Sequence, residues 1–472
     1  MSTTLLPPHQ PPDISAYLEH ASLHKSSIEK RLIEQRLVGF DEFDIPSNPL
    51  DELDVLNHYG FAGKCDMTDK FRVLTVNDHS FGNETLFIAV QLIDTDGLVV
   101  HYDSCPETLE LVRRRADTLQ LSDRIRFTSD LDMLLSSLRA TSPPEEAERG
   151  FGLFDYVRCC NALDHSDKPL ELFDTMLAFV KENGVLGVSC LGYYGREPHR
   201  QLQQLAKIVA EEIDGVKQEM MFIRELYNFA LPNCWSKLAF ENLESPLRAM
   251  TDEAILTDIM REDKFALRVP ELQTLLDEHG LHLASFSRHT RAMYQPWFAK
   301  RNKELEERLQ TLNEKQLAAI SEIAWNKIER HIFWATRREN TRPDYNDPDN
   351  IPFFHHFTNR SHGWRQHLLG LKPGKPLEVN ATVAPQEQFQ LKSDWNDVTY
   401  RFVTLIDGYK TLGEIAVVIR EESRLGLDEI IETCGRFLKA VEWEDAILIR
   451  SRETSFIPFT ARQVRADNGM TK

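Results

Sequence analysis

The sequence lacks an excess of basic residues, and this absence narrows the possible partners. Its 472 residues carry 74 acidic and 55 basic side chains, for a formal net charge of −19. A protein that binds phosphate backbones needs clustered Lys and Arg to displace counterions. We therefore expect no nucleic-acid partner.

Other features are also missing. No run of 18 apolar residues occurs, so we expect no membrane span. The opening MSTTLLPPHQPPD has neither the basic start nor the apolar stretch of a signal peptide. The seven cysteines are scattered and form no CxxC pair, which favours reduced thiols. Together these absences predict a cytoplasmic location.

Short β-rich runs alternate with helical runs along the first half of the chain. Continuous apolar strands separated by helices are typical of a parallel, doubly wound α/β sheet. We therefore predict a Rossmann-like α/β fold. The predicted strands are residues 71–76, 98–103, 124–130, 154–160 and 185–192, and a helix over 169–184 is expected to end at Gly184.

Composition divides the chain into four parts. We predict an N-terminal tail and helix (1–56), a sheet core (57–196), a helical cap that also completes the core (197–340) and a C-terminal domain (353–460). The charged stretch 301–339 is expected to be a solvated helical face. The C-terminal domain has a helix–turn–helix-like pattern and could be a winged-helix or peptide-recognition domain. Because residues 398–450 hold 7 basic against 10 acidic side chains, phosphate contact is not expected there.

The turn after the first predicted strand is the most informative segment. A nucleotide-type ligand binds where such a turn enters a helix, and a carboxylate ending the second strand accepts its ribose hydroxyls. Asp103 follows Gly82 by 21 residues, close to the spacing expected for that acid. Gly82 is the one glycine in the turn 77–82, which disfavours a bulky dinucleotide pyrophosphate. A ligand without phosphates suits this turn better.

Residues 57 to 299 resemble a class I S-adenosylmethionine-dependent methyltransferase. The resemblance rests on VLTVNDHSFGNETLFIA, LVVHYDSCPETLELVRRRADTLQLSDRIRF and FDYVRCCNALDHSDKPLELFDTMLAFVKENGVLGV. The sequence departs from the family pattern at Thr75, where an acid is usual, and at Asn77 and His79, where glycines are usual.

The resemblance implies a cofactor, S-adenosylmethionine, and a set of residues that hold it. Asp103 would bind the ribose, Asp130 the adenine amine, and Asn161 to His165 would line the cofactor and acceptor cleft. The cofactor-binding candidates are Asn77, Asp78, Ser80, Gly82, Asp103, Ser104, Asp130 and Asn161.

Methyl transfer makes few chemical demands on a protein. Because the sulfonium is already activated, the enzyme supplies proximity, orientation and sometimes a base. Candidate acceptor-side residues are Tyr59, His165 and Tyr193, each of which could instead be a positioning or core residue. No metal is predicted, since the histidines from His355 to His367 match no standard zinc spacing.

Three further segments resemble a bacterial subgroup of the family that carries a C-terminal extension. They are NHYGFAG, FALRVPELQTLLDEHGLHLASF and IDGYKTLGEI, an order similar to that of protein-lysine methyltransferases with a regulatory domain. The resemblance implies a protein, peptide or small-molecule acceptor, and a homodimer or a heterodimer with a related methyltransferase. Two interpretations remain open: an active methyltransferase, or a catalytically inactive protein of the same fold that acts as a structural or regulatory partner.

Overall fold

A computed structural model describes most of the chain between residues 48 and 455. The gaps are residues 78–81, 94, 142–153, 211–215, 230–254, 256–258, 262, 340, 356–358 and 385–386. The predicted N-terminal helix and two site candidates, Asp78 and Ser80, lie outside the described residues.

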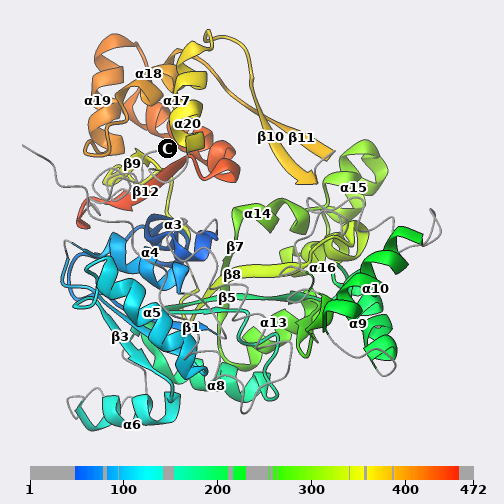
Figure 1. Ribbon diagram of the computed structural model, residues 1–472. Helices are drawn as coiled ribbons and strands as arrows, with labels where there is room; N and C mark the ends of the chain where they lie inside the picture. The colour runs from blue at the N-terminus through cyan, green and yellow to red at the C-terminus, as the bar shows by residue number, and fades with distance from the viewer. Residues whose placement is uncertain are drawn as a thin grey trace, which may run out of the picture.

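A mixed sheet forms the centre of the molecule (Figure 1). Its strand order is β3-β2-β1-β4-β5-β8-β7, and β6 pairs with β5 beside this path. The strands from β1 to β6 are parallel where they pair, whereas β8 is antiparallel to both β5 and β7. The doubly wound α/β prediction is therefore confirmed. The strands are β1 (Arg72–Asn77), β2 (Leu98–Asp103), β3 (Ile125–Thr128), β4 (Phe154–Cys160), β5 (Val180–Gly192), β6 (Ala266–Leu267), β7 (His282–Phe286) and β8 (Arg330–Thr336).

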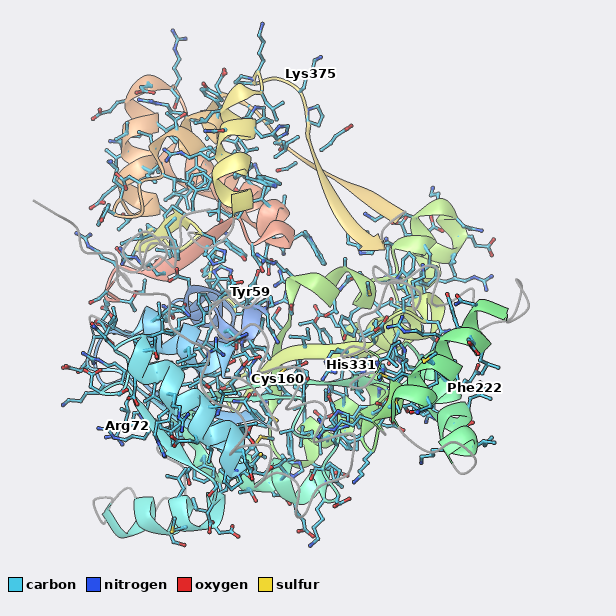
Figure 2. The ribbon with its side chains drawn as sticks, in the orientation of Figure 1. Tyr59, Arg72, Cys160, Phe222, His331 and Lys375 are labelled. Carbon is cyan, nitrogen blue, oxygen red and sulfur yellow. The ribbon has the colours of Figure 1, made fainter. Side chains whose placement is uncertain are left out.

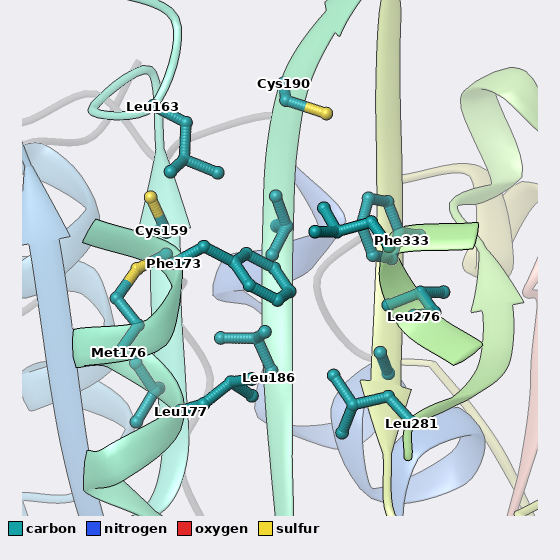
Figure 3. Close-up of a cluster of buried hydrophobic side chains, with 14 of the residues drawn as sticks. Cys159, Leu163, Phe173, Met176, Leu177, Leu186, Cys190, Leu276, Leu281 and Phe333 are labelled. Carbon is teal, nitrogen blue, oxygen red and sulfur yellow. The ribbon is translucent and has the colours of Figure 1, made fainter. Parts of the chain in front are cut away.

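Helices cover both faces of this sheet because each strand is apolar on both sides. One face, called here the N-terminal face, packs against η1 (Pro49–Asp51), α3 (Leu53–Gly60), α4 (Asn83–Gln91) and α5 (Pro106–Thr118). The opposite face packs against α6 (Leu131–Thr141), α8 (Pro169–Phe179), α13 (Val269–Glu278) and α16 (Glu314–Trp325). Figure 3 shows part of the second core, where Phe173 and Met176 of α8 meet Leu186 of β5.

Two sequence predictions about elements are wrong. Helix α8 ends at Phe179, not Gly184, because Val180 is already extended and pairs with Phe154 of β4. The stretch 301–339, predicted to be helical throughout, contains strand β8. The run from Ile332 to Ala335 is apolar enough to fill the space between β5 and β7, so burial overrides the helical pattern around it.

The described parts of the cap segment after β5 include several helices. Among them are α9 (Glu197–Ala210), α10 (Val216–Phe229), α14 (Arg288–Arg291), η4 (Ala292–Tyr294), η5 (Trp297–Arg301) and α15 (Lys303–Leu309). None of the helices in the described ranges has the length and apolar character needed to cross a membrane.

The C-terminal domain is mainly helical and has its own core. Strands β9 and β12 form a small antiparallel pair, and β10 and β11 form a hairpin that extends to η4 of the cap (Figure 1). Its elements are β9 (Asn350–Phe354), α17 (Asn359–Gly370), β10 (Leu377–Ala384), β11 (Glu387–Ser393), α18 (Asp397–Leu405), α19 (Leu412–Glu422), α20 (Leu427–Val441), η6 (Glu442–Glu444) and β12 (Ile447–Ser451).

Candidate cofactor site at the carboxyl edge of the sheet

The carboxyl ends of β1 and β2 place two candidate residues side by side. Asn77 and Asp103 are the last residues of their strands and are paired in register. Both are buried, and both face the N-terminal side of the sheet, since they alternate with Val76 and Tyr102. The sequence therefore located this edge correctly.

Asp103 lies at the start of the turn into α5. Its carboxylate is fully buried, and its Oδ1 accepts a hydrogen bond from the backbone N–H of Cys105 at 2.8 Å. This bond fixes the carboxylate at the strand end. The neighbouring candidate, Ser104, is exposed in the same turn.

Gly82 is the residue that begins α4. Its backbone is left-handed, with φ of +67°, and a Cβ built there would lie 2.4 Å from Cγ1 of Val112. Any side chain would therefore clash with α5 as well as strain the backbone. The glycine is required by the close approach of α4 and α5.

A second polar row crosses the same face one step below the carboxyl edge. His101 on β2, Thr75 on β1 and Arg158 on β4 are aligned across the three central strands. All three are completely buried. Polar side chains are unusual at the centre of a parallel sheet, where apolar residues normally pack.

Arg158 connects this row to neighbouring elements. Its Nη1 donates to Oδ1 of Asn77 at 3.0 Å, and its Nη2 donates to Oδ2 of Asp51 on η1 at 3.2 Å. The Nε also pairs with Asp51, and Oε1 of Glu84 on α4 lies 4.0 Å from Nη2. Burial raises the pKa of Asp51 to about 7, against the opposing effect of Arg158. Four elements thus meet at one guanidinium group.

His101 is held by hydroxyl groups on the same face. Its Nδ1 lies 2.7 Å from Oγ1 of Thr85 and 3.3 Å from Nδ2 of Asn77. Burial lowers the pKa of His101 to about 4, so the imidazole is neutral at pH 7. Its Nε2 is buried, with no hydrogen-bond partner within the described part of the chain.

The remaining cofactor candidates lie at the ends of β3 and β4. Asp130 follows β3, is exposed, and caps α6 by accepting from the N–H of Met133 at 2.8 Å. Asn161 follows β4 in a left-handed conformation, with φ of +65°, and its Oδ1 accepts from Arg330. Both therefore lie at the carboxyl edge together with Asp103.

An ion pair between a buried carboxylate and a partly exposed arginine supports the segment after β4. Asp164 is fully buried, pairs with Arg330 of β8, and accepts from the N–H of Leu191 at 3.0 Å. His165 is the next residue and is partly exposed. The pair fixes the turn that carries Asn161 and His165 against the end of β5.

The aromatic candidates have different surroundings. The Tyr193 ring, just after β5, is contacted by the guanidinium groups of Arg200 and Arg268, whose carbons are 4.2 and 4.1 Å from the ring centroid. These two cation–π contacts restrain the ring. Tyr193 therefore belongs to the carboxyl edge, on the side of the cap.

The structure does not bring Tyr59 to the same place. Its hydroxyl donates to Oδ1 of Asp445 at 2.5 Å and accepts from Nη1 of Arg291 at 2.7 Å. The ring stacks on Trp334 of β8, with centroids 5.8 Å apart. Figure 2 shows Tyr59 on α3, between the sheet and the C-terminal domain, whereas Cys160 marks the end of β4. The acceptor-side role predicted for Tyr59 does not fit a hydroxyl committed to the domain junction.

Sequence reasoning missed Asp51, His101 and Arg158. The signal for Arg158 was present, because an arginine inside the apolar run FDYVRCC cannot lose its charge and needs a buried partner. The identity of that partner was not readable, since Asp51 lies 107 residues earlier.

Comparison with solved structures places this arrangement in a known class. The chain is similar to PKMT2 from Rickettsia typhi in complex with AdoHcy, with a TM-score of 0.58, 11% identity, and coverage of 86% of this chain and 77% of that chain. A second structure of PKMT2 from the same organism gives a TM-score of 0.57 at 12% identity, over 86% and 76% of the two chains. This chain has the class I methyltransferase fold. No family model and no curated protein sequence matches the chain.

Within the class I methyltransferase fold, the carboxyl edge carries most of the described candidates. Asn77, Gly82, Asp103, Asp130 and Asn161 all lie at strand ends or helix starts along it. The edge offers a buried carboxylate, several side-chain amides and a helix N-terminus. Among the described residues no group of three or more His, Cys, Asp or Glu side chains could hold a metal ion.

Proposed function

We propose that the chain is an S-adenosylmethionine-dependent methyltransferase that holds its cofactor across the carboxyl ends of β1, β2 and β4. The observation that carries this proposal is the buried carboxylate of Asp103, paired in register with Asn77 and close to the start of α4. A buried carboxylate at this strand end is suited to accept hydrogen bonds from the two hydroxyls of a ribose.

The chemistry of the edge fits this cofactor better than a dinucleotide. S-adenosylmethionine has no phosphate, and the edge has one glycine in the turn before α4 and no phosphate-binding glycine loop. The carboxylates of Asp51 and Glu84 lie against the guanidinium of Arg158, and Asp103 adds a buried carboxylate at the end of β2; these negative charges suit a cationic sulfonium. PKMT2, which shares the fold, has been solved with AdoHcy.

In the proposed mechanism the residues of this chain mainly orient the reactants. Asp103 would hold the ribose, Asp130 would meet the adenine side, and the Asn161–His165 turn would face the acceptor. The bound cofactor supplies an activated methyl group, so transfer needs close approach and in-line orientation more than acid–base chemistry. Asp164 and Arg330 keep the acceptor-side turn in place.

The acceptor would enter from the side of the cap, past Tyr193 and His165. A protein, peptide or small molecule are the acceptor classes predicted from the sequence, and the acidic net charge favours basic protein or peptide surfaces. A homodimer, or a heterodimer with a related methyltransferase, belongs to the same proposal.

A second candidate function is a catalytically inactive partner protein of this fold. The observation in its favour is that Asn77, at the point where the cofactor's methionine part would lie, already bonds to both Arg158 and His101. Binding without turnover, or no binding, would support this alternative.

Calorimetric titration with S-adenosylmethionine and S-adenosylhomocysteine tests the proposal. We expect micromolar binding that weakens at least tenfold in Asp103→Ala, because two charge-assisted hydrogen bonds are lost. Asp96→Ala is the matched control, since Asp96 is exposed just before the amino end of the same strand. No heat at millimolar ligand would contradict the proposed function.

A further inference from the structure

The buried arginine on β4 is not needed to fill the apolar core. Replacing a buried ion pair with well-packed apolar residues is often neutral or stabilising, because charges are costly to desolvate. Every other residue of β4 between Tyr156 and Cys159 is apolar. The energetic cost of Arg158 therefore has to be offset by something other than core packing.

The contacts of Arg158 determine how Asn77 is oriented. Guanidinium groups only donate hydrogen bonds, so the Oδ1 of Asn77 must face Arg158 and its Nδ2 must face His101. The Nδ1 of His101 then accepts, and the ring proton lies on Nε2. Thr85 completes the arrangement as a donor to the same Nδ1 at 2.7 Å. One arginine thus sets the direction of the hydrogen bonds across β1 and β2.

The same guanidinium reaches both ends of the connection between β1 and α4. Asn77 is the last residue of β1, and Glu84 is in the first turn of α4. Asp51 brings η1 to the same point from the N-terminal side. The position of the β1 end, relative to α4 and η1, is therefore fixed through a single side chain.

We propose that Arg158 is a positioning residue for the cofactor site, which fixes Asn77 and the end of β1 where the methionine part of S-adenosylmethionine would bind. This inference rests on the proposed function. In this chain, side-chain bonds to Arg158 take over the positioning that a glycine-rich turn would provide through its backbone.

The test is a double variant that removes the charge pair without leaving one partner buried alone. Asp51→Asn combined with Arg158→Met keeps the volume and neutralises both groups. The matched control is Asp445→Asn combined with Arg291→Met, another buried acid–arginine pair, at the domain junction. Affinity for S-adenosylhomocysteine is measured by calorimetry, and Tm is measured in parallel.

We expect the Asp51/Arg158 double variant to remain folded and to lose at least tenfold in affinity, while the control stays within about twofold of the wild type. Adding Asn77→Ala to the double variant should cost little more, because both changes remove the same positioning contact. Arg158→Lys, which keeps the charge but loses the fork, should lie between wild type and the double variant.

Two results would count against the inference, and they are distinguishable from failure of the proposed function. If the Asp51/Arg158 double variant binds S-adenosylhomocysteine within twofold of the wild-type affinity, the inferred role of Arg158 is wrong. The proposed function would be unaffected by that result. Fully additive losses from the double variant and Asn77→Ala would also contradict the role of Arg158. If the wild-type chain binds neither ligand, the proposed function fails, and the inference fails with it.

Discussion

At the scale of single residues, the structure gives a physical reason for the glycine at position 82. In the sequence, Gly82 stands out as the one glycine in the turn 77–82. The structure assigns it two separate constraints, a left-handed backbone and contact with Val112 of α5. Its presence is therefore explained by helix packing, independently of any ligand.

Gly82→Ala should destabilise the protein more than Gly280→Ala does. Both glycines have positive φ, but a Cβ at Gly280 would meet nothing within 4 Å. The left-handed backbone costs about 1 kcal/mol at either site, and overpacking against Val112 adds about 1–3 kcal/mol at Gly82. Urea unfolding of the two variants measures the difference, and equal losses would contradict the packing argument.

Single residues also mark where prediction from sequence stopped. The position of Asp103 at a strand end could be predicted because it depends on local order, a strand followed by a turn. Arg158 could not be assigned, because its partners on η1 and β1 lie 107 and 81 residues away. The sequence therefore predicted positions that depend on adjacent residues in the chain. It did not predict contacts between residues that are far apart in the chain.

At the scale of elements, α3 connects the sheet to the C-terminal domain. His58 accepts from the backbone N–H of Ile449 on β12 through Nδ1 at 3.0 Å, and Tyr59 bonds to Asp445. Tyr59, predicted on the acceptor side, and its neighbour His58 thus join α3 to the C-terminal domain. The sequence resemblance singled out the segment NHYGFAG but predicted neither a helix there nor the surface that it faces.

His58 should make stability depend on pH. Burial lowers its pKa to about 4 from 6.5, so between these values the unfolded chain binds more protons than the folded one. Its contribution is present above pH 6.5 and is lost as the pH falls toward 4, by up to about 3 kcal/mol.

The measurement is urea unfolding of wild type and His58→Gln at pH 7 and pH 4.5. The wild type should lose stability relative to the variant at the lower pH, because the variant lacks the His58 imidazole, which the folded wild type must keep neutral. If wild type and His58→Gln differ in free energy of unfolding by the same amount at both pH values, His58 is not the source of the pH dependence.

Strands and helices were predicted correctly where the hydrophobic pattern of the sequence is continuous. They were predicted incorrectly where burial in the folded protein determines the secondary structure. The alternation from β1 to β5 was clear because each strand is a largely apolar run separated from the next by a helical pattern. Strand β8 was missed because it follows charged helices in the sequence, and it is stabilised as a strand by insertion between β5 and β7.

At the scale of the whole molecule, the order of strands explains why the candidate site forms where it does. Parallel strands β1, β2 and β4 end at one edge, where Asn77 and Asp103 are the last residues of β1 and β2 and Asn161 follows β4. The C-terminal domain packs beside α3 and contacts the cap through its hairpin (Figure 1). The alternation of strands and helices in the sequence was sufficient to predict the α/β fold class. The position of the C-terminal domain depends on contacts between segments far apart in the chain, which the sequence pattern does not predict.

The central claim is that the carboxyl edge binds S-adenosylmethionine, and hydrogen–deuterium exchange with saturating S-adenosylhomocysteine tests it most directly. The account predicts slower exchange in peptides that contain the ends of β1, β2 and β4, around Asn77, Asp103 and Asn161, and little change along β7. Unchanged exchange at all three strand ends, or protection confined to another part of the molecule, would contradict it.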